Sequence, residues 1–119
     1  MTAPRPLEII AHRQSRLLEV RFDDGAQFRL PFEYLRVKSP SAEVQGHGPG
    51  QEVLVAGKRL VGIDEIEPVG HYGVLLHFDD GHDTGIFAWS TLYRLGRDQP
   101  ANWQAYLDAL ADAGLSRDP

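Results

Sequence analysis

Hydrophobic and polar residues alternate on both sides of two Asp-Asp-Gly sequences, and this pattern predicts two antiparallel hairpins. The first is Phe22-Asp23-Asp24-Gly25 and the second is Phe78-Asp79-Asp80-Gly81. Each follows an apolar strand and precedes a second one, after which leucine and aromatic residues occur. This echo is compatible with an internal duplication and also with two independent hairpins that use the same favourable turn residues.

The residues around the first turn predict its register. A three-residue turn that ends in Gly25, with the glycine in the left-handed conformation, places six apolar residues on one face. A two-residue turn would place polar residues beside that face, so we expect the three-residue form. The resulting pairs are Phe22 with Ala26, Val20 with Phe28, and Leu18 with Leu30.

The same turn type, applied to the second hairpin, places His82 on the inward face opposite Phe78. The further pairs are then Leu76 with Thr84, and Val74 with Ile86. A two-residue turn would instead group His82 with His77 and Asp79 on the outward face. The first hairpin favours the inward placement.

Helices are expected in three places. Two are short, over residues 32–36 and 90–95, and Gly96 is expected to close the second. The longest covers residues 100–113, between Asp98 as its N-cap and Gly114 as its terminator. Its apolar stripe, at helical spacing, consists of Trp103, Tyr106, Leu107 and Leu110.

The rest of the chain reads as a loop and one more strand. Residues 39–57 are rich in Ser, Pro and Gly and predict the loop. The strand is expected over residues 58–67, and Pro68-Val69-Gly70 is expected to end it.

These elements predict an α+β fold: a small β-rich domain of antiparallel hairpins with short helices and a C-terminal helix packed on the sheet. A chain of 119 residues is long enough for one such domain with its own core. We expect the domain to span residues 7–115, after a disordered lead-in over residues 1–6 and before a frayed tail over residues 116–119.

Composition excludes several classes of protein. The chain has no cysteine, which removes disulfides, thiolate metal sites and cysteine nucleophiles and is typical of a cytoplasmic protein. Its net charge of -5 argues against non-specific binding to nucleic acid or to anionic membranes. The negative charge is concentrated after residue 38, where the sequence contains 5 Lys and Arg but 12 Asp and Glu. No apolar run approaches the roughly 18 residues of a membrane span.

No motif predicts an enzyme. The glycine-rich residues 46–50 lack the spacing of a dinucleotide loop, and Gly57-Lys58 is followed by Arg59 where a phosphate-binding loop needs Ser or Thr. The paired aspartates lie in turns, where turn chemistry explains them. There is no G-x-S-x-G sequence around a serine nucleophile. We therefore expect neither nucleotide binding nor catalysis.

Several segments together resemble one known family. They are Leu30-Pro31, Leu35-Arg36, Ser39-Pro40-Ser41-Ala42-Glu43-Val44, Gly46-His47-Gly48, Ile66-Glu67-Pro68-Val69-Gly70-His71-Tyr72, and Phe78-Asp79-Asp80-Gly81-His82-Asp83-Thr84-Gly85-Ile86-Phe87-Ala88-Trp89. Over about residues 7–97 the chain is similar to the gamma-butyrobetaine hydroxylase-like N-terminal domain family, a bacterial family of unknown function. The resemblance implies a small β-rich domain with short helices. Such domains occur alone, in front of 2-oxoglutarate oxygenases of the carnitine pathway, and fused to Mrp-type P-loop ATPases that assist iron–sulfur cluster assembly.

The resemblance also implies a zinc site in the oxygenases, formed by C-x-C-x-x-C and by the histidine of D-G-H. Here Ser39, Ser41 and Val44 stand at the thiolate positions, and only His82 matches a ligand. Thiolate zinc sites contribute about 10–16 kcal/mol, and neutral hydroxyls replace thiolates poorly. We therefore expect that the zinc is lost and that His82 is a packing or hydrogen-bonding residue.

From these observations we expect a non-catalytic accessory or protein-interaction domain without a cofactor. Its expected partner is an Mrp-type ATPase of iron–sulfur assembly, bound through the acidic second half or the loop over residues 39–57. The alternative is an iron- or zinc-binding domain that uses His82 with His71, His77 or Asp79. Exposed hairpin edges also allow a homodimer.

Overall fold

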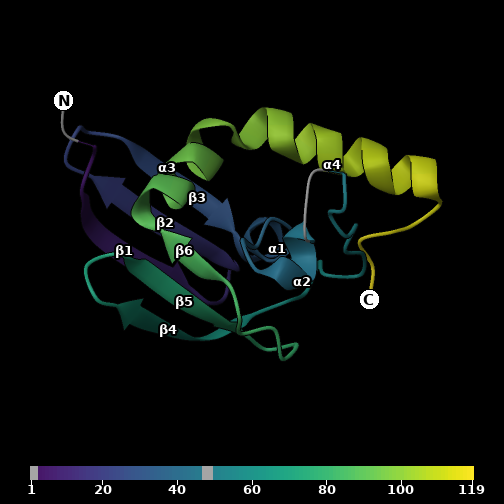
Figure 1. The fold of residues 1–119 in the computed structure, drawn as a ribbon, viewed down its shortest axis with the longest axis horizontal. Coiled ribbons are helices and arrows are strands. Elements are labelled where there is room, and N and C mark those ends of the chain that lie inside the picture. Colours follow the sequence, from purple (N-terminus) through teal and green to yellow (C-terminus); the bar gives the residue numbers. More distant parts are fainter. Residues whose placement is uncertain (1–2, 47–49) are drawn as a thin grey trace.

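The computed structural model describes residues 3–46 and 50–119, which form two three-stranded antiparallel sheets and four helices (Figure 1). The strands are β1 (Pro6–His12), β2 (Leu17–Phe22), β3 (Gln27–Pro31), β4 (Ile63–Val69), β5 (Gly73–Phe78) and β6 (Ile86–Ala88). The helices are α1 (Phe32–Val37), α2 (Ala42–Gln45), α3 (Trp89–Arg97) and α4 (Gln99–Ala113). This arrangement confirms the α+β class. Residues 47–49 of the glycine-rich loop lie outside the described residues.

The chain repeats one unit, in which three antiparallel strands lead directly into a helix. In the first repeat, β1, β2 and β3 precede α1; in the second, β4, β5 and β6 precede α3. Corresponding bonds fix each helix start. The Phe32 N–H donates to the Arg16 carbonyl at 2.9 Å, and the Trp89 N–H donates to the Tyr72 carbonyl at 3.3 Å. The echo seen around the two turns therefore extends over a complete structural unit.

The first hairpin, between β2 and β3, has the predicted register. The Phe22 N–H donates to the Ala26 carbonyl at 2.9 Å, and Gly25 has a φ of 90°, as the three-residue turn requires. The ladder contains the two predicted pairs, Val20 with Phe28 and Leu18 with Leu30. These residues face inward into the core.

The second hairpin confirms the prediction at its turn only. The Phe78 N–H donates to the His82 carbonyl at 3.0 Å, and His82 is buried on the inward face. Beyond the turn the prediction is wrong, because Val74 pairs with Phe87 and not with Ile86. An extra residue therefore separates this turn from the returning strand, which begins only at Ile86.

Burial explains this shift. It places Phe87 in the core with no exposed surface and leaves Ile86 42% exposed on the other face. Thr84 lies outside the ladder, and its hydroxyl makes a 2.6 Å hydrogen bond with the Ser41 hydroxyl. The shift therefore buries the larger side chain, that of Phe87, in the core. The extra residue lies in the segment before β6, which the hydrogen bond between Thr84 and Ser41 holds in place.

The remaining strands differ from the prediction at their ends. β4 begins at Ile63 rather than at residue 58, and it continues through Pro68, which was expected to end it. Because β4 is an edge strand, a residue without an N–H is tolerated there. β1 was not predicted. It begins at Pro6, next to Arg5, whose N–H donates to the Asp23 carboxylate at 2.9 Å.

The predicted helices are present with altered boundaries. α1 and α4 match their predicted ranges closely, and Gly114 caps α4 with a φ of 68°. Asp98 precedes α4 as predicted, but its side chain makes no capping hydrogen bond and pairs with Arg97 instead. α3 continues through Gly96, because this glycine serves packing: a Cβ there would lie 2.2 Å from the Phe28 Cγ. α2 lies inside the predicted loop, where Ser41 caps it by accepting from the Glu43 N–H at 3.2 Å.

The core lies between the two repeats, with both sheets, α1 and α3 contributing to one cluster. α4 buries its stripe against α1 and residues 54–56, in a second cluster that Trp103 joins to the main core. Residues 116–119, expected to fray, lie along residues 57–59 instead. The Gly57 N–H donates to the Ser116 carbonyl at 2.9 Å, and the Arg59 N–H donates to the Arg117 carbonyl at 3.0 Å. Among the described residues, no helix has the length and apolarity of a membrane span.

Candidate functional site

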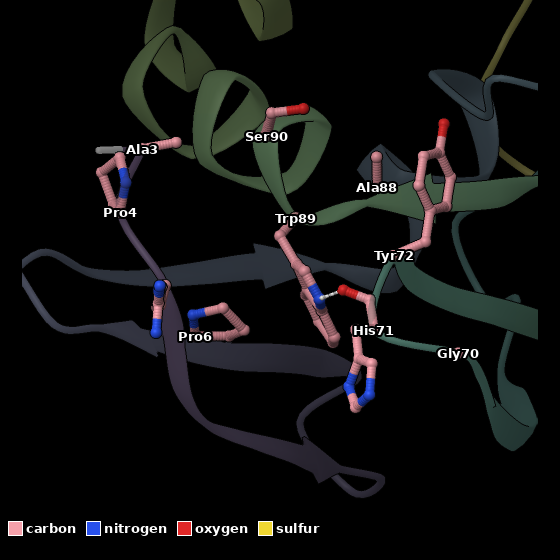
Figure 2. A pocket seen from close by; sticks show the side chains of 10 residues that line it. Ala3, Pro4, Pro6, Gly70, His71, Tyr72, Ala88, Trp89 and Ser90 are labelled. Carbon is pink, nitrogen blue, oxygen red and sulfur yellow. Dashed lines mark hydrogen bonds between the residues drawn. The ribbon is translucent and has the colours of Figure 1, made fainter. Parts of the chain in front are cut away.

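A cleft of about 760 Å³ lies between the two repeats (Figure 2). Its walls are the N-terminal segment 3–6, the β4–β5 turn over residues 70–72, and the start of α3 over residues 88–90. Tyr72 is 64% exposed at its edge. The Trp89 indole N–H donates to the His71 carbonyl at 3.1 Å, which fixes the indole at the floor. The cleft offers ring surfaces to a ligand.

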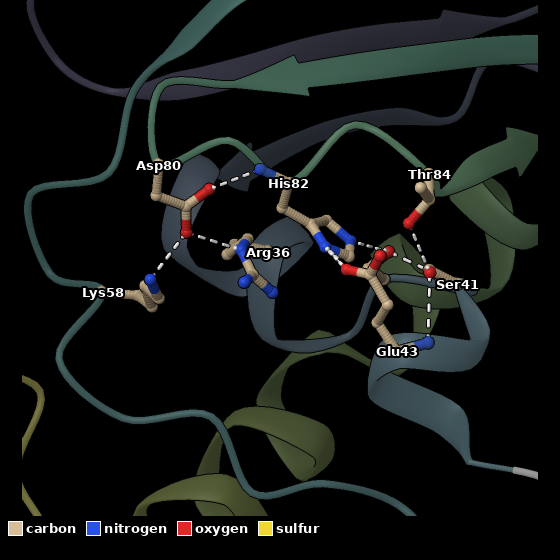
Figure 3. A network of polar contacts seen from close by, with 8 residues as sticks. Arg36, Ser41, Glu43, Lys58, Asp80, His82 and Thr84 are labelled. Carbon is tan, nitrogen blue, oxygen red and sulfur yellow. Dashed lines mark hydrogen bonds and ion pairs between the residues drawn. The ribbon is translucent and has the colours of Figure 1, made fainter.

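The residues singled out from the sequence meet elsewhere, in a corner between α1, α2 and the second hairpin (Figure 3). We call this the polar corner; it consists of Ser39, Ser41, Glu43, His82 and Thr84. Ser39 is fully buried, and Ser41 and His82 are 6% and 4% exposed. The structure therefore brings His82 together with two of the three positions that correspond to thiolates. The third, Val44, is buried on the same helical turn as Ser41.

A line of hydrogen bonds runs through His82 from the surface to the interior. The Nδ1 atom lies 2.9 Å from the Glu43 Oε2, and the Nε2 atom lies 2.8 Å from the Ser39 Oγ. Because a carboxylate only accepts, Nδ1 carries the proton toward Glu43. In the neutral ring, Nε2 then accepts from the Ser39 hydroxyl. Both ring nitrogens are thus satisfied although the ring is buried.

The serines complete this arrangement. The Ser39 Oγ accepts a 3.3 Å hydrogen bond from the Ser41 N–H while it donates to His82. The Ser41 Oγ contacts the Thr84 hydroxyl at 2.6 Å and caps α2. Gly85 makes room for this packing, since a Cβ there would lie 2.2 Å from the Ser39 Oγ. Every polar side chain of the polar corner has a partner within the protein.

Asp80 anchors the turn beside the polar corner. Its Oδ2 lies 2.8 Å from the Arg36 Nε and 2.6 Å from the Lys58 Nζ, and its Oδ1 accepts from the His82 N–H at 3.1 Å. Burial by itself would raise the pKa of Asp80, but the hydrogen bonds from Lys58 and Arg36 outweigh it and lower the pKa to about 2. The carboxylate is therefore charged throughout the physiological range.

The order Glu43–His82–Ser39 has the connectivity of a serine-hydrolase triad, but its burial is reversed. In a hydrolase the acid is buried and the serine faces the substrate. Here the Glu43 side chain is 61% exposed, whereas Ser39 has no exposed surface. A substrate carbonyl has no path to the hydroxyl in this arrangement. The line of hydrogen bonds therefore fits a structural role.

The donors of the polar corner do not fit the zinc that the family resemblance implies. Serine hydroxyls are neutral at physiological pH, and Val44 has no donor atom. The alternative metal site also lacks its ligands around His82. His77 lies on the outward face, where Glu67 binds it at 3.0 Å, and His71 lines the cleft. Residues 3–46 and 50–119 contain no group of three or more His, Asp or Glu placed to hold a metal.

Sequence reasoning found Ser39, Ser41, Val44 and His82, but it missed the residues that satisfy His82 and Asp80. Glu43 and Arg36 stand out only as parts of the segments that carry the family resemblance, and Lys58 lies far from the second turn along the chain. One signal for Glu43 was present: it follows Ser41, a residue that can cap a helix, and acidic residues are favoured in the first helical turn. The contacts of Arg36 and Lys58 with Asp80 depend on tertiary packing and leave no local pattern.

Comparison with known proteins gives a consistent result. A family model described as "Gamma-butyrobetaine hydroxylase-like, N-terminal" matches residues 9–93. Two protein structures solved by NMR in solution are 47% and 50% identical to the chain, with TM-scores of 0.85 and 0.84. The alignments cover 99% and 100% of this chain and 93% and 92% of those chains.

A crystal structure from Acidithiobacillus ferrooxidans is also similar. It is described as a protein of unknown function that belongs to the DUF971 family. It is 48% identical, with a TM-score of 0.65, and the alignment covers 77% of this chain and 92% of that chain. The search of curated proteins gave no match.

Proposed function

Because the chain belongs to the gamma-butyrobetaine hydroxylase-like N-terminal domain family, we propose that it is a non-catalytic protein-interaction module that serves iron–sulfur cluster assembly through a P-loop ATPase partner of the Mrp type. One contrast supports the interaction role: the serine hydroxyls and the imidazole of the polar corner are buried, whereas rings of the cleft are exposed. Ser39 has no exposed surface, whereas Tyr72 is 64% exposed. The ATPase part rests on the fusions that the family resemblance implies.

The exposed ring surfaces suit binding better than catalysis. Aromatic side chains supply large contact areas at interfaces, and an exposed Tyr has surface to bury there. The cleft lies between the two repeats and opens to solvent, so a protein partner can reach it. The polar corner, by contrast, holds its hairpin and α2 in place. We assign it the task of keeping the module rigid, without a cofactor.

The purified Mrp-type ATPase of the same organism tests this proposal. Isothermal titration calorimetry under reducing, anaerobic conditions, without nucleotide and with ADP or ATP, should detect a complex with a Kd of about 1 μM, near −8 kcal/mol. Ser39→Ala should bind equally well, since the hydroxyl is buried. A complete absence of binding in all nucleotide states would contradict the ATPase assignment. Loss of binding in Ser39→Ala with the fold intact would contradict the purely structural role of the polar corner.

A further inference from the structure

We propose that the cleft binds an extended peptide segment of the partner, one that carries a carboxylate next to a proline or aromatic ring. This deepens the proposed function, on which it rests for the existence of a partner. The ring surfaces, the charge of the cleft, and the repeat that relates the two halves of the fold each support the inference.

Five rings line the cleft. Pro4 and Pro6 lie on the N-terminal wall, while His71, Tyr72 and Trp89 form the opposite wall and the floor (Figure 2). Prolines have no N–H, so the N-terminal wall presents ring surface there rather than donors. The Trp89 N–H is already bonded to the His71 carbonyl. These surfaces favour another ring, because they gain by burial and stacking without breaking hydrogen bonds.

The charge of the cleft favours a carboxylate. Arg5 is its one Lys or Arg, and no carboxylate lines it among the described residues, although the whole chain carries a net charge of -5. Within residues 3–46 and 50–119, the Arg5 guanidinium takes part in none of the ion pairs. A guanidinium binds a carboxylate through two parallel hydrogen bonds. An acidic segment is therefore attracted to this opening, whereas a second copy of this acidic chain is repelled.

The wall that carries Arg5 is held in place before any ligand arrives. The Arg5 N–H donates to the Asp23 carboxylate at 2.9 Å, and its carbonyl accepts from the Asp23 N–H at 2.8 Å. In the second repeat, Gly62 holds the corresponding place, since its carbonyl accepts from the Asp79 N–H at 2.9 Å. A fixed backbone reduces the entropy that binding must overcome.

The second repeat supplies the precedent for an extended occupant. Residues 116–119 lie along residues 57–59 there, just before Gly62, and Pro119 lines a small pocket together with Leu60 and Val61. Arg117 donates two hydrogen bonds to Glu33, at 2.9 and 2.7 Å. Glu33 is the second residue of α1, as Ser90 is the second residue of α3 and part of the cleft. An extended segment with a charged side chain thus occupies the corresponding place in one repeat, and the cleft is open in the other.

An NMR titration with synthetic peptides tests the inference. The probe is GSPDFPSG, and its matched control is GSPKFPSG, in which lysine replaces the aspartate. The chain contains two tryptophans, so the indole signals of Trp89 and Trp103 report separately on the cleft and on α4. The acidic peptide should shift the Trp89 signal and the amides of residues 70–72, and the lysine peptide should not. Equal shifts with both peptides, shifts elsewhere only, or no shifts would overturn the inference.

Variants identify the groups responsible. Arg5→Gln should weaken binding of the acidic peptide about tenfold, as expected for loss of one charge-assisted contact. Arg97→Gln, at the far end of α3, is the matched control and should bind as the wild type does. Unchanged affinity in Arg5→Gln would overturn the charge argument. Sedimentation at the same concentrations should show a monomer; a dimer that Tyr72→Ala dissolves would overturn the assignment to a peptide.

The two proposals fail separately. If the ATPase binds the wild type and the Arg5→Gln, Tyr72→Ala variant equally well, the cleft inference is wrong and the proposed function stands. If the acidic peptide binds the cleft but the ATPase does not bind the wild type, the ATPase assignment is wrong and the cleft inference stands.

Discussion

In the first repeat, the Phe28 ring packs directly on Gly96 beside the hairpin turn, whereas in the second repeat Ser39 packs on Gly85 at the corresponding place. Each contact joins a side chain in or directly after the first repeat to a glycine of the second repeat. Each is possible only because the glycine has no Cβ. Around Phe28 the neighbours are aromatic, with Phe22 and Tyr93 in edge-to-face contact. Around Ser39 they are His82, Glu43 and Ser41.

Each helix also contacts the hairpin turn of the other repeat. Tyr93 of α3 donates to the Asp24 carboxylate of the first turn at 2.6 Å, and Arg36 of α1 donates to the Asp80 carboxylate of the second turn at 2.8 Å. The same backbone unit therefore tolerates either aromatic or polar side chains beside its turn. The polar corner needs no metal to be satisfied, because hydrogen bonds do there what ring packing does in the first repeat.

The largest effect is expected from rebuilding a thiolate site in the polar corner. Ser39→Cys, Ser41→Cys and Val44→Cys together with His82 would supply four zinc donors. Because thiolate sites bind zinc by about 10–16 kcal/mol, the triple variant should bind zinc tightly and unfold at a higher temperature with zinc than without it. Calorimetry measures this, and adding His82→Ala to the triple variant should weaken the binding. Absent binding would show that these positions do not converge.

The next effect is the loss of His82. His82→Ala removes a buried ring and leaves the Ser39 hydroxyl without its partner, so it should lower the free energy of unfolding by about 2–4 kcal/mol. Urea denaturation measures the change. His77, whose side chain is 26% exposed on the outer face and paired with Glu67, is the matched control, and His77→Ala should cost under about 1 kcal/mol. Similar small losses for both variants would mean that the hydrogen-bond line through His82 contributes little.

Gly96 and Gly85 lie at the two contacts that differ between the repeats. Gly96→Ala forces the Phe28 ring to move and should cost about 2 kcal/mol. Gly85→Ala meets mainly the Ser39 Oγ, since the Ser39 Cβ would lie at an ordinary 3.5 Å. The cost of Gly85→Ala should therefore nearly vanish in a Ser39→Ala background. A double-mutant cycle by urea denaturation measures this coupling, and additive costs would refute the contact.

The smallest effect is a difference in acid sensitivity. The pKa of Asp80 lies at about 2, below its ordinary 3.8. A lowered pKa stabilises the fold above pH 4, and this contribution, about 1–2 kcal/mol, is lost as the pH falls from about 4 to about 2. Asp80→Asn should therefore flatten the stability profile in that window. Asp24, whose pKa the Tyr93 hydrogen bond also lowers, is exposed, so Asp24→Asn should change the profile less. Identical profiles for the two variants would contradict the comparison.

Local patterns accounted for much of the fold. The first hairpin, both helix starts after the third strands, and the inward position of His82 follow from turn chemistry and alternation. The register shift after Thr84 could not be predicted from the sequence, because it depends on whether Phe87 or Ile86 is buried. Only the packed core shows that Phe87 is the buried residue. β1 and the course of residues 116–119 were missed for a similar reason, since distant partners, such as Asp23 for Arg5, hold them in place.

The candidate site was predicted only in part. The positions Ser39, Ser41, Val44 and His82 came from the family resemblance, and the structure brings them together at the polar corner. Their hydrogen-bond partners could not be read from the sequence, because Glu43 reaches His82 only after α2 has formed. The cleft was not predicted at all, since its walls come from three segments that lie far apart in the chain.

Native mass spectrometry of the untagged protein, purified without chelators, tests the central claim most directly. If hydrogen bonds through His82 hold the polar corner together, the folded protein should have the mass of the bare chain and should unfold identically with and without added EDTA. A stoichiometric bound metal that disappears in His82→Ala would contradict the account.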